Sequence, residues 1–399
     1  MDILITNVFG IKNKGDQALF ECLRESLNVV QGKGPTRLAA VATNPDDNKA
    51  VYGEIKWVGL PWTSLFTNKL LRKVAILTKA AFFLIFDFIL GGSFSGLAKE
   101  VKRADLVLAS PGGYLEDSTW SYFAHLFQLL LCVRHGKALI LSPQSLGPMQ
   151  NFVGRKLTKL VLSHARAVFC RDQYSLEFCY QLFKEIPVNV FKTTDMVVVS
   201  DKLSKHGLVA LTGVIGMTVL DWGCGGDSTA RQNYIKVLKE VVLELELKGR
   251  KVMLIPQTSI LGNPDMEVAQ MVQQGTKAEI LTQPESLDEF LAHFRRIDVI
   301  VGMRLHSCLL ALMCGVPAIS ISYLPKCWEI MRDLGLSDFV IDVKTIELQR
   351  LLVLVSSLEN PAVREDYWNR FESSRVRLKS DFNRVFENRV SEIVDEKDA

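Results

Sequence analysis

The feature that most constrains the fold of this chain is a regular alternation of two apolar patterns. Short β-branched runs such as residues 299–301 are followed at once by stretches with helical spacing, such as Leu305, Leu309 and Leu312. The first pattern is typical of strands buried on both faces, and the second of helices that cover them. Their alternation predicts an α/β fold in which parallel sheets lie between layers of helices.

The alternation runs through the chain twice. We expect strands near 2–7, 37–42, 105–109, 138–142, 166–169 and 188–192, and then near 214–219, 251–255, 278–281, 297–301 and 318–322. Helices are expected near 16–30, 121–135, 151–164, 173–184, 230–248, 265–274, 286–294, 305–314 and 345–357. The polar stretch 200–207 reads as a linker between two Rossmann-like domains, residues 1–200 and 208–360. Such sheets bind ligands beyond the carboxyl ends of their strands, so the two domains are expected to face a cleft.

The end of the chain follows a different pattern. Residues 361–399 are highly charged, with apolar residues such as Tyr367, Phe371 and Phe382 at helical spacing. This predicts a long amphipathic helix. We expect it to pack across both domains and return to the first one.

Composition excludes several classes of protein. The net charge is +3 and no Lys/Arg block stands out, which argues against a nucleic-acid partner. The eight cysteines have no zinc-ligand spacing, so we predict no metal site and free thiols in a reducing cytoplasm. The chain starts with the apolar strand 3–5 and without a basic n-region and cleavage site, so we do not expect secretion. The glycine cluster 223–226 lacks the GxGxxG spacing, so no nucleotide cofactor is expected.

One segment, residues 74–90, is strongly apolar but interrupted by Lys79 and Asp87. A membrane-spanning helix needs about 20 apolar residues with few charges, and this run falls short of that. We expect a buried or partly buried helix of the first domain. The alternative is a helix that lies on a membrane surface.

The sharpest chemical signal follows the predicted strand that ends at Gly302. Arg304 and His306 come just as a helical pattern begins, and backbone N–H groups at a helix N-terminus favour an anion. Arginine offers a fork that fits carboxylate or phosphate, and histidine can transfer a proton near neutral pH. Tyr323 and Lys326 follow the next strand and are expected to point toward the same cleft. The alternative is that Arg304 pairs with a carboxylate at the edge of the core and His306 caps a turn.

A second signal follows the first strand. Gly15 permits close approach of the backbone, Asn13 is suited to a hydroxyl, and Asp16 lies where a helix begins. We expect the Asp16 carboxylate to orient or deprotonate a substrate hydroxyl, or alternatively to cap the helix.

A third signal again comes directly after a strand. Gly112 and Gly113 would let a ligand lie against the backbone, and Asp117 would line an acceptor pocket or cap a helix. Gln257, which follows a strand of the second half, is a weaker candidate for substrate binding.

In this order, the segments resemble the polysaccharide pyruvyl transferase family. The resemblance rests on the N-x-G-D loop at residues 13–16, the glycine pair 112–113 with Asp117, PQSLGP at 143–148, Arg171-Asp172 before Ser175, and the run from Gly302 to Lys326 that contains R-L-H and G-V-P. It spans residues 3 to 330, and its last block is the most specific part.

The resemblance implies a fold similar to GT-B glycosyltransferases. It also implies transfer of a pyruvyl group from phosphoenolpyruvate to a sugar of a surface polysaccharide or its lipid-linked precursor, as a ketal, without a cofactor. In the family the arginine and histidine of R-L-H are associated with phosphoenolpyruvate, which points to Arg304 and His306 here. For that chemistry we expect Arg304 to hold the anion, His306 to donate the proton and Lys326 to offset the phosphate charge. Asp16 or Asp117 would activate the acceptor hydroxyl. The chain departs from the family at Leu220, where an arginine commonly precedes an Asp-Trp pair.

Two other functions stay open on the sequence alone. Basic loops in the second domain also suit a GT-B-like glycosyltransferase that uses a nucleotide sugar. Leu220 alone would suit a silent assembly partner that has kept the cleft without the chemistry. We expect the protein to work in the cytoplasm, at the inner face of the membrane if residues 74–90 touch it.

Overall fold

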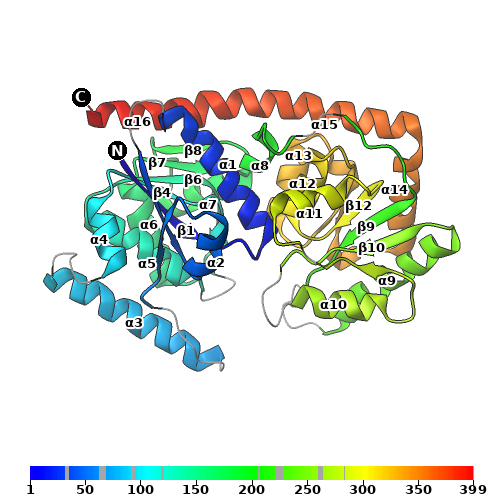
Figure 1. The fold of residues 1–399 in the computed structure, drawn as a ribbon, viewed down its shortest axis with the longest axis horizontal. Helices are drawn as coiled ribbons and strands as arrows, with labels where there is room; N and C mark the ends of the chain where they lie inside the picture. Colours follow the sequence, from blue (N-terminus) through cyan, green and yellow to red (C-terminus); the bar gives the residue numbers. More distant parts are fainter. Residues whose placement is uncertain are drawn as a thin grey trace. The chain divides into compact units, whose positions relative to one another are not determined.

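The computed structural model describes residues 1–31, 36–62, 69–90, 95–117, 121–204, 207–221, 228–258, 264–282 and 284–398. These residues form two compact units with a parallel sheet in each (Figure 1). Unit 1 comprises residues 1–11, 19–196 and 380–399, and unit 2 comprises 12–18 and 197–379. The first turn of the first helix therefore groups with unit 2, although the strand before it belongs to unit 1. The glycine cluster 223–226 and residues 205 and 206 of the expected linker lie outside the described residues.

The sheet of unit 1 has the strand order β3-β2-β1-β4-β6-β7-β8, with β5 paired to β6. Its strands are β1 Asp2–Val8, β2 Arg37–Ala42, β3 Lys56–Gly59, β4 Leu106–Ala109, β5 Gly112–Leu115, β6 Ala138–Leu146, β7 Ala167–Cys170 and β8 Val190–Lys192. Its helices are α2 Pro45–Val51, α3 Lys69–Leu90, α4 Gly96–Arg103, α5 Ser121–Arg134, α6 Phe152–His164, α7 Gln173–Phe183 and most of α1 Lys14–Gln31. The order reverses between β1 and β4, which is where open α/β sheets place ligands.

The sheet of unit 2 has the order β11-β10-β9-β12-β13-β14. Its strands are β9 Val214–Thr218, β10 Lys251–Leu254, β11 Glu279–Ile280, β12 Val299–Gly302, β13 Ala318–Ser322 and β14 Val340–Asp342. The helices α9 Ser228–Leu247, α10 Pro264–Gln273, α11 Leu287–Phe294, α12 Leu305–Met313, α13 Pro325–Asp333 and α14 Leu348–Glu359 belong to it, with the short turns η2 Ser337–Phe339 and η3 Val343–Thr345. The short helix α8 Met196–Val199 lies at the border of the units. Here the order reverses between β9 and β12.

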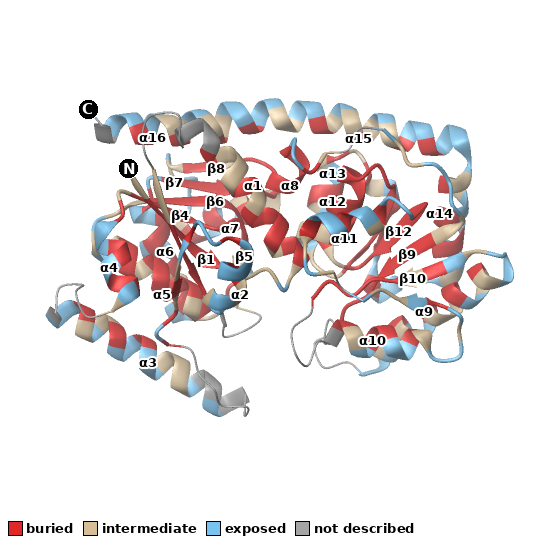
Figure 2. Ribbon diagram, in the orientation of Figure 1, coloured by how far each residue is buried: buried red, intermediate tan, exposed pale blue. Residues whose placement is uncertain are grey.

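All recorded pairings between the strands are parallel, and the central strands are buried (Figure 2). Strands covered on both faces read as continuous apolar runs, and this is why the sequence pattern located them. Several short elements, among them β3, β5, α4 and α13, were not predicted, because they are too short to show a clear period.

The last helices contribute to both units. Tyr367 of α15 Pro361–Phe382 is fully buried, and its hydroxyl donates to the Ala318 carbonyl of β13 at 2.8 Å. Beyond it, in η4 Asn383–Glu387, the Phe386 ring meets Phe169 of β7 edge-on at 4.8 Å. The segment ends with α16 Asn388–Asp398.

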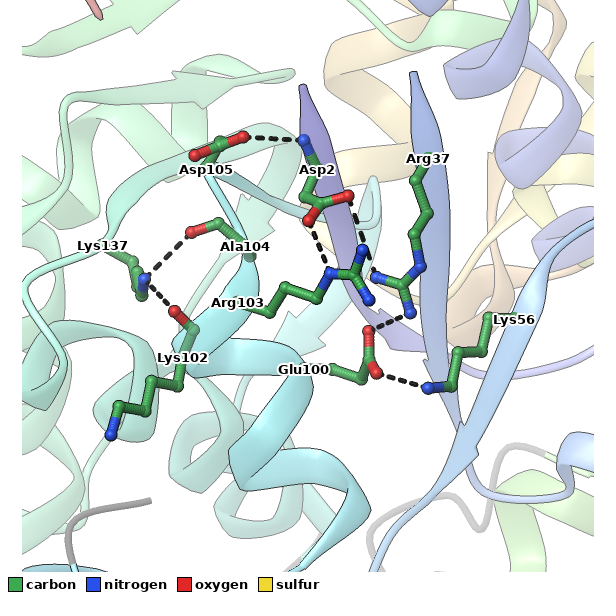
Figure 3. Close-up of polar contacts among 9 residues, drawn as sticks. All are labelled: Asp2, Arg37, Lys56, Glu100, Lys102, Arg103, Ala104, Asp105 and Lys137. Atoms are coloured by element: carbon green, nitrogen blue, oxygen red, sulfur yellow. Dashed lines mark hydrogen bonds and ion pairs between the residues drawn. The ribbon is translucent and has the colours of Figure 1, made fainter. Parts of the chain in front are cut away.

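The strands of unit 1 begin in a network of ion pairs (Figure 3). The buried Glu100 carboxylate of α4 accepts from Arg37 of β2 and Lys56 of β3, both at 2.6 Å. At the start of β1, Arg103 donates to Asp2 at 2.7 Å. Burial alone would raise the pKa of Glu100, but the hydrogen bonds from Lys56 and Arg37 hold it below its usual value. This network ties α4 to three strands.

The apolar segment 74–90 lies within α3, a helix packed on α5. Ala80 and Phe83 are buried in the core of unit 1, whereas Phe82 and Ile85 are exposed. The prediction of a partly buried helix is therefore confirmed. None of the described helices has the length and apolarity needed to cross a bilayer.

Candidate functional site

The candidate site of unit 2 begins at the tight connection from β12 to α12. A side chain at Gly302 would overlap the Cys308 sulfur, so only glycine fits at the end of the strand. The Ser307 hydroxyl lies 2.8 Å from the Thr218 hydroxyl at the end of β9, which also accepts from the Met303 backbone N–H at 3.2 Å. These contacts fix the first turn of α12 at the point where the strand order reverses.

Arg304 is the N-cap residue of α12 and is held by one carboxylate. Its Nε and Nη2 donate to the two oxygens of Asp265, each at 2.7 Å, and Asp265 is fully buried in the first turn of α10. The alternative considered from the sequence, in which Arg304 pairs with a carboxylate, is thus present in the structure. However, the pair uses only one edge of the guanidinium, and no other acceptor among the described residues hydrogen-bonds to it. With 23% of its side chain exposed, Arg304 can still meet an anion through its remaining N–H groups.

The Arg304 guanidinium keeps its positive charge. Burial by itself would lower the pKa of the guanidinium, but the hydrogen bonds and charge of Asp265 raise it above its ordinary value. Tyr323 and Asp16 raise this pKa further, which brings both residues into the electrostatic neighbourhood of Arg304.

His306 lies against the first turn of α1. A Cβ atom built on Gly15 would come within 2.8 Å of the His306 Cβ and 2.9 Å of its Nδ1. The close approach of the backbone that was expected at Gly15 is therefore an approach to this imidazole. Asp16 is next in the chain, so the structure brings Gly15, Asp16, Arg304 and His306 together within unit 2.

Asn13 caps α1. Its side-chain oxygen accepts from the backbone N–H groups of Gly15 at 3.0 Å and Asp16 at 3.4 Å. The cap that the sequence analysis allowed for Asp16 is therefore supplied by Asn13. This arrangement leaves Asp16 in the first turn of the helix with its carboxylate in the field of Arg304.

Lys14 is a site residue that the sequence analysis missed. It is buried, and its ammonium donates to the Glu285 carbonyl at 2.6 Å and to the Gln17 side chain at 3.1 Å. Burial lowers its pKa to about 8, although Glu289 and Glu285 act in the opposite direction. The signal was present as a lysine inside the loop between Asn13 and Gly15, but its burial could not be read from the sequence.

The other predicted residues of unit 2 occupy neighbouring strand ends. Gln257 is buried after β10, and its carbonyl accepts from the Lys14 backbone N–H at 3.2 Å. Tyr323 and Lys326 follow β13, with Lys326 in the first turn of α13. All three therefore lie at the carboxyl edge of the sheet, since parallel strands end on one side.

Leu220, at the position where the resemblance implies an arginine, is buried. Its backbone N–H donates to the Tyr234 hydroxyl at 3.4 Å. The following residue, Asp221, is paired with Arg231 of α9 through contacts of 2.7 to 3.1 Å. Tyr234, one turn beyond Arg231, is coupled electrostatically to both Asp221 and Arg304. Arg231 thus brings positive charge to the surroundings of Leu220.

Unit 1 holds the remaining predicted residues. One Asp117 oxygen accepts from the backbone N–H groups of Gln150 at 2.5 Å and Asn151 at 2.7 Å, just before α6. Gly112 has φ +152°, and a Cβ there would overlap the ring of Tyr114. Gly112 and Gly113 thus begin β5 beside an aromatic side chain, and Asp117 organises the loop that follows it.

A neutral polar cluster at the carboxyl edge of unit 1 was also missed from the sequence. Tyr114 stacks on His125 of α5 with ring centroids 4.8 Å apart. One turn further along α5, the Gln128 side chain accepts from the Asn7 backbone N–H at 3.0 Å, and the Gln144 amide donates to the Ser110 carbonyl. The Asn7 and Gln144 oxygens and the His125 Nδ1 are buried without a hydrogen-bond partner among the described residues. Burial lowers the pKa of His125 to about 4, so its ring is neutral at pH 7.

Two motifs that carried the family resemblance form a buried network instead of a site. Arg171 donates to Asp195 at 2.7 Å and to the Ser145 hydroxyl at 2.8 Å, and all three residues are buried. Ser145 donates in turn to Asp172, the N-cap residue of α7. These polar groups satisfy one another where β6 and β7 end.

A cavity of about 700 Å³ in unit 1 lies elsewhere. It is lined by Asp105, Lys137 and Arg166, which precede β4, β6 and β7. It therefore opens at the amino ends of the strands, away from the edge where the candidate residues gather, and we assign it no part in the site.

Solved structures of other proteins share this fold. In structure, the chain is similar to a candidate UDP-N-acetylglucosamine 2-epimerase from Listeria monocytogenes, with TM-score 0.59, 13% identity and 97% coverage of both chains. It is also similar to the glycotransferase of kitacinnamycin (TM-score 0.57, 15% identity, 99% of this chain and 98% of that one) and to a UDP-GlcNAc 2-epimerase from Neisseria meningitidis (0.56, 13%, 96% and 100%). At such low identity these structures show the fold alone, and they confirm the GT-B-like prediction.

Among curated proteins, none matches the chain. The family model described as polysaccharide pyruvyl transferase matches residues 13–325, from the capping loop of α1 to the start of α13. This range covers most of the chain and includes both Arg304 and His306, so the protein belongs to the polysaccharide pyruvyl transferase family.

Proposed function

We propose that this protein transfers the pyruvyl group of phosphoenolpyruvate to a sugar of a surface polysaccharide or its lipid-linked precursor, where it forms a ketal. The observation that carries the proposal is the arrangement around Arg304. A buried carboxylate orients its guanidinium at a helix N-terminus, and His306, two residues further along the chain, lies against Gly15. A permanent cation beside a group that can transfer a proton suits a small anionic donor.

The donor carries both a carboxylate and a phosphate, so its site needs more than one cation. Arg304 would hold one anionic group through the N–H groups that Asp265 leaves unused. Lys14 and Lys326 would offset the charge of the other, with Tyr323 and Gln257 as further contacts. Arg231 would supply the charge that Leu220 cannot.

The reaction can be written with these side chains. His306 donates a proton to the methylene carbon of the donor, and C2 acquires oxocarbenium character. A sugar hydroxyl forms a C–O bond at C2 while Asp16 accepts its proton. Phosphate then leaves with the electrons of its bond to C2 and takes up the proton held by Asp16, and a second hydroxyl of the same sugar attacks C2 to close the ketal. The products are the ketal and inorganic phosphate, and the proton taken from the second hydroxyl restores the acid.

Asp16 is the better candidate for the base than Asp117. Asp16 shares unit 2 with His306 and Arg304, whereas one Asp117 oxygen is already bound by two backbone N–H groups. We assign Asp117 to the shape of the acceptor loop beside Gly112 and Gly113.

The neutral cluster around His125 is suited to the acceptor. Its unsatisfied Asn7 and Gln144 oxygens would accept hydrogen bonds from sugar hydroxyls, and the Tyr114 ring would provide an apolar surface. Without a charge of its own it offers little to phosphoenolpyruvate. Because that donor is made in the cytoplasm, the reaction would take place there, at the inner face of the membrane for a lipid-linked acceptor.

A second candidate is a glycosyltransferase that uses a nucleotide sugar, since the Neisseria meningitidis relative binds UDP-GlcNAc. Calorimetric titration with phosphoenolpyruvate, UDP-sugars and GDP-sugars separates the two. We expect heat of binding with phosphoenolpyruvate alone, and its loss in Arg304→Gln but not in Arg332→Gln, a change of an exposed arginine in the same unit. Binding of a nucleotide sugar alone would establish the second candidate, and binding of neither donor would favour a silent assembly partner.

Turnover is tested by phosphate release from phosphoenolpyruvate with a panel of lipid-linked glycans. We expect release that depends on both the glycan and His306. A His306→Gln protein that releases phosphate at the normal rate would remove this histidine from the mechanism.

A further inference from the structure

Helix α3 has apolar residues on two sides. On the inner side, Ala80 and Phe83 are buried in the core of unit 1, and Ile76, Leu77 and Leu84 pack against that core. The outer side also carries large apolar residues, and these are strongly exposed: Val74 (54%), Phe82 (60%), Ile85 (58%), Phe88 (70%) and Ile89 (67%). An ordinary surface helix has one apolar side only.

The outer residues form one surface. Val74, Phe82, Ile85 and Ile89 follow helical spacing, so they lie on the same side of the helix. The Phe82 ring contacts Phe86 with centroids 4.4 Å apart, and the Arg134 guanidinium lies 4.6 Å from the centre of the Phe88 ring. Figure 2 shows exposed positions along α3. A contiguous apolar patch of this kind marks an interaction site.

The charges of α3 show what the patch would meet. The helix contains one acid, Asp87, which is buried and bound by Arg134 Nε and His135 Nε2, both at 2.9 Å. Its basic residues are Lys69, Arg72, Lys73 and Lys79, of which Lys79 is exposed next to Phe82. The acid is thus removed from the surface and Lys79 is presented there, which complements an anionic partner.

We propose that α3 lies on the surface of a bilayer that contains anionic lipids. Phe82, Ile85 and Ile89 enter the boundary between headgroups and acyl chains, and Lys79 contacts the headgroups. Since α3 cannot span a bilayer, it lies in the plane of the interface. This binding is independent of the donor, the acceptor and catalysis.

The test is co-sedimentation with phosphatidylcholine vesicles that contain or lack phosphatidylglycerol. We expect binding to the anionic vesicles, and at least a ten-fold weaker partition for a variant that combines Phe82→Gln, Ile85→Gln and Ile89→Gln. The matched control combines Leu247→Gln, Val353→Gln and Val376→Gln, three exposed apolar residues of unit 2. We expect the control to bind as the unaltered protein does. Equal binding of both variants, or no binding of the unaltered protein, would overturn the proposal.

A second measurement does not depend on how the triple variant folds. In an Ile85→Trp protein, the added fluorescence should be quenched by lipids brominated on their acyl chains, whereas Leu247→Trp should be unaffected. Sedimentation velocity without lipid tests whether a second copy of the chain covers the patch instead. A dimer that the α3 substitutions dissociate, together with an unquenched tryptophan at position 85, would assign the surface to a second copy of the chain.

Discussion

The contact between Gly15 and His306 predicts that substituting Gly15 lowers activity strongly and changes stability little. Gly15 is the second residue of α1, where alanine would favour the helix by about 1 kcal/mol. The added Cβ, however, would lie 2.8 Å from the His306 Cβ and 2.9 Å from its Nδ1. Ordinary carbon contacts are about 3.5 to 4.0 Å, so the imidazole must move by roughly 0.5 to 1 Å.

Such a displacement should be costly for catalysis. A misplacement of about 1 Å can reduce a rate by about 100-fold, which corresponds to about 2.7 kcal/mol of barrier. We therefore expect Gly15→Ala to lower kcat/KM for phosphate release from phosphoenolpyruvate by about 100-fold. Its Tm should change little, because the helix gain offsets part of the contact strain.

The matched control is Gly96→Ala, at the first residue of α4. A Cβ there lies 3.6 Å from Val58, an ordinary contact, so activity should be unchanged. A Gly15→Ala protein with normal kcat/KM would refute the idea that this glycine positions His306. A large fall in Tm would instead show that the loop absorbs the strain by unfolding.

Three further predictions concern charged groups. Burial lowers the pKa of Lys14 to about 8, so between pH 8 and about 10.5 the unfolded chain binds more protons than the folded one, and the free energy of unfolding rises with pH. Lys14→Met should abolish this rise, measured as denaturant midpoints, and an unchanged rise would contradict the prediction. Lys56 and Arg37 hold the pKa of Glu100 low, so this carboxylate contributes to the free energy of unfolding above pH 4.5, its usual pKa, and the contribution is lost as the pH falls further. Glu100→Gln should lower stability by about 1–2 kcal/mol at pH 7, and on acidification it should lose less further stability than the unaltered protein. Arg231→Gln should raise the KM for phosphoenolpyruvate about ten-fold with little change in Tm, and an unaltered KM would leave Leu220 without a substitute.

The sequence located the main strands of both sheets because buried parallel strands have a simple apolar signature. The turn from β12 to α12 was equally predictable, because Gly302 ends the apolar strand pattern and Arg304 and His306 stand where the helical spacing begins. What the sequence could not provide was the partner of each polar residue. Asp265 is the second residue of α10 and no motif marks it, yet it fixes the guanidinium of Arg304.

The same limit applies in unit 1. His125 lies inside an apolar helix pattern, and the residues next to it in the sequence do not indicate polar surroundings. Asp117 looked like a substrate-binding acid because it follows paired glycines, but its contacts with Gln150 and Asn151 depend on a loop whose path only coordinates reveal. A motif marks a place in the chain, whereas the role of each side chain depends on what the fold brings beside it.

The division of the chain into units also bears on the mechanism. Residues 12–18 follow β1 of unit 1 but pack within unit 2, through the Lys14 contacts with Gln257 and Glu285. Asp16 therefore belongs to the same compact unit as His306 and Arg304. The proposed proton donor, the proposed base and the proposed anion-binding group are thus all contributed by unit 2, so the acid–base pair is assembled within a single compact unit.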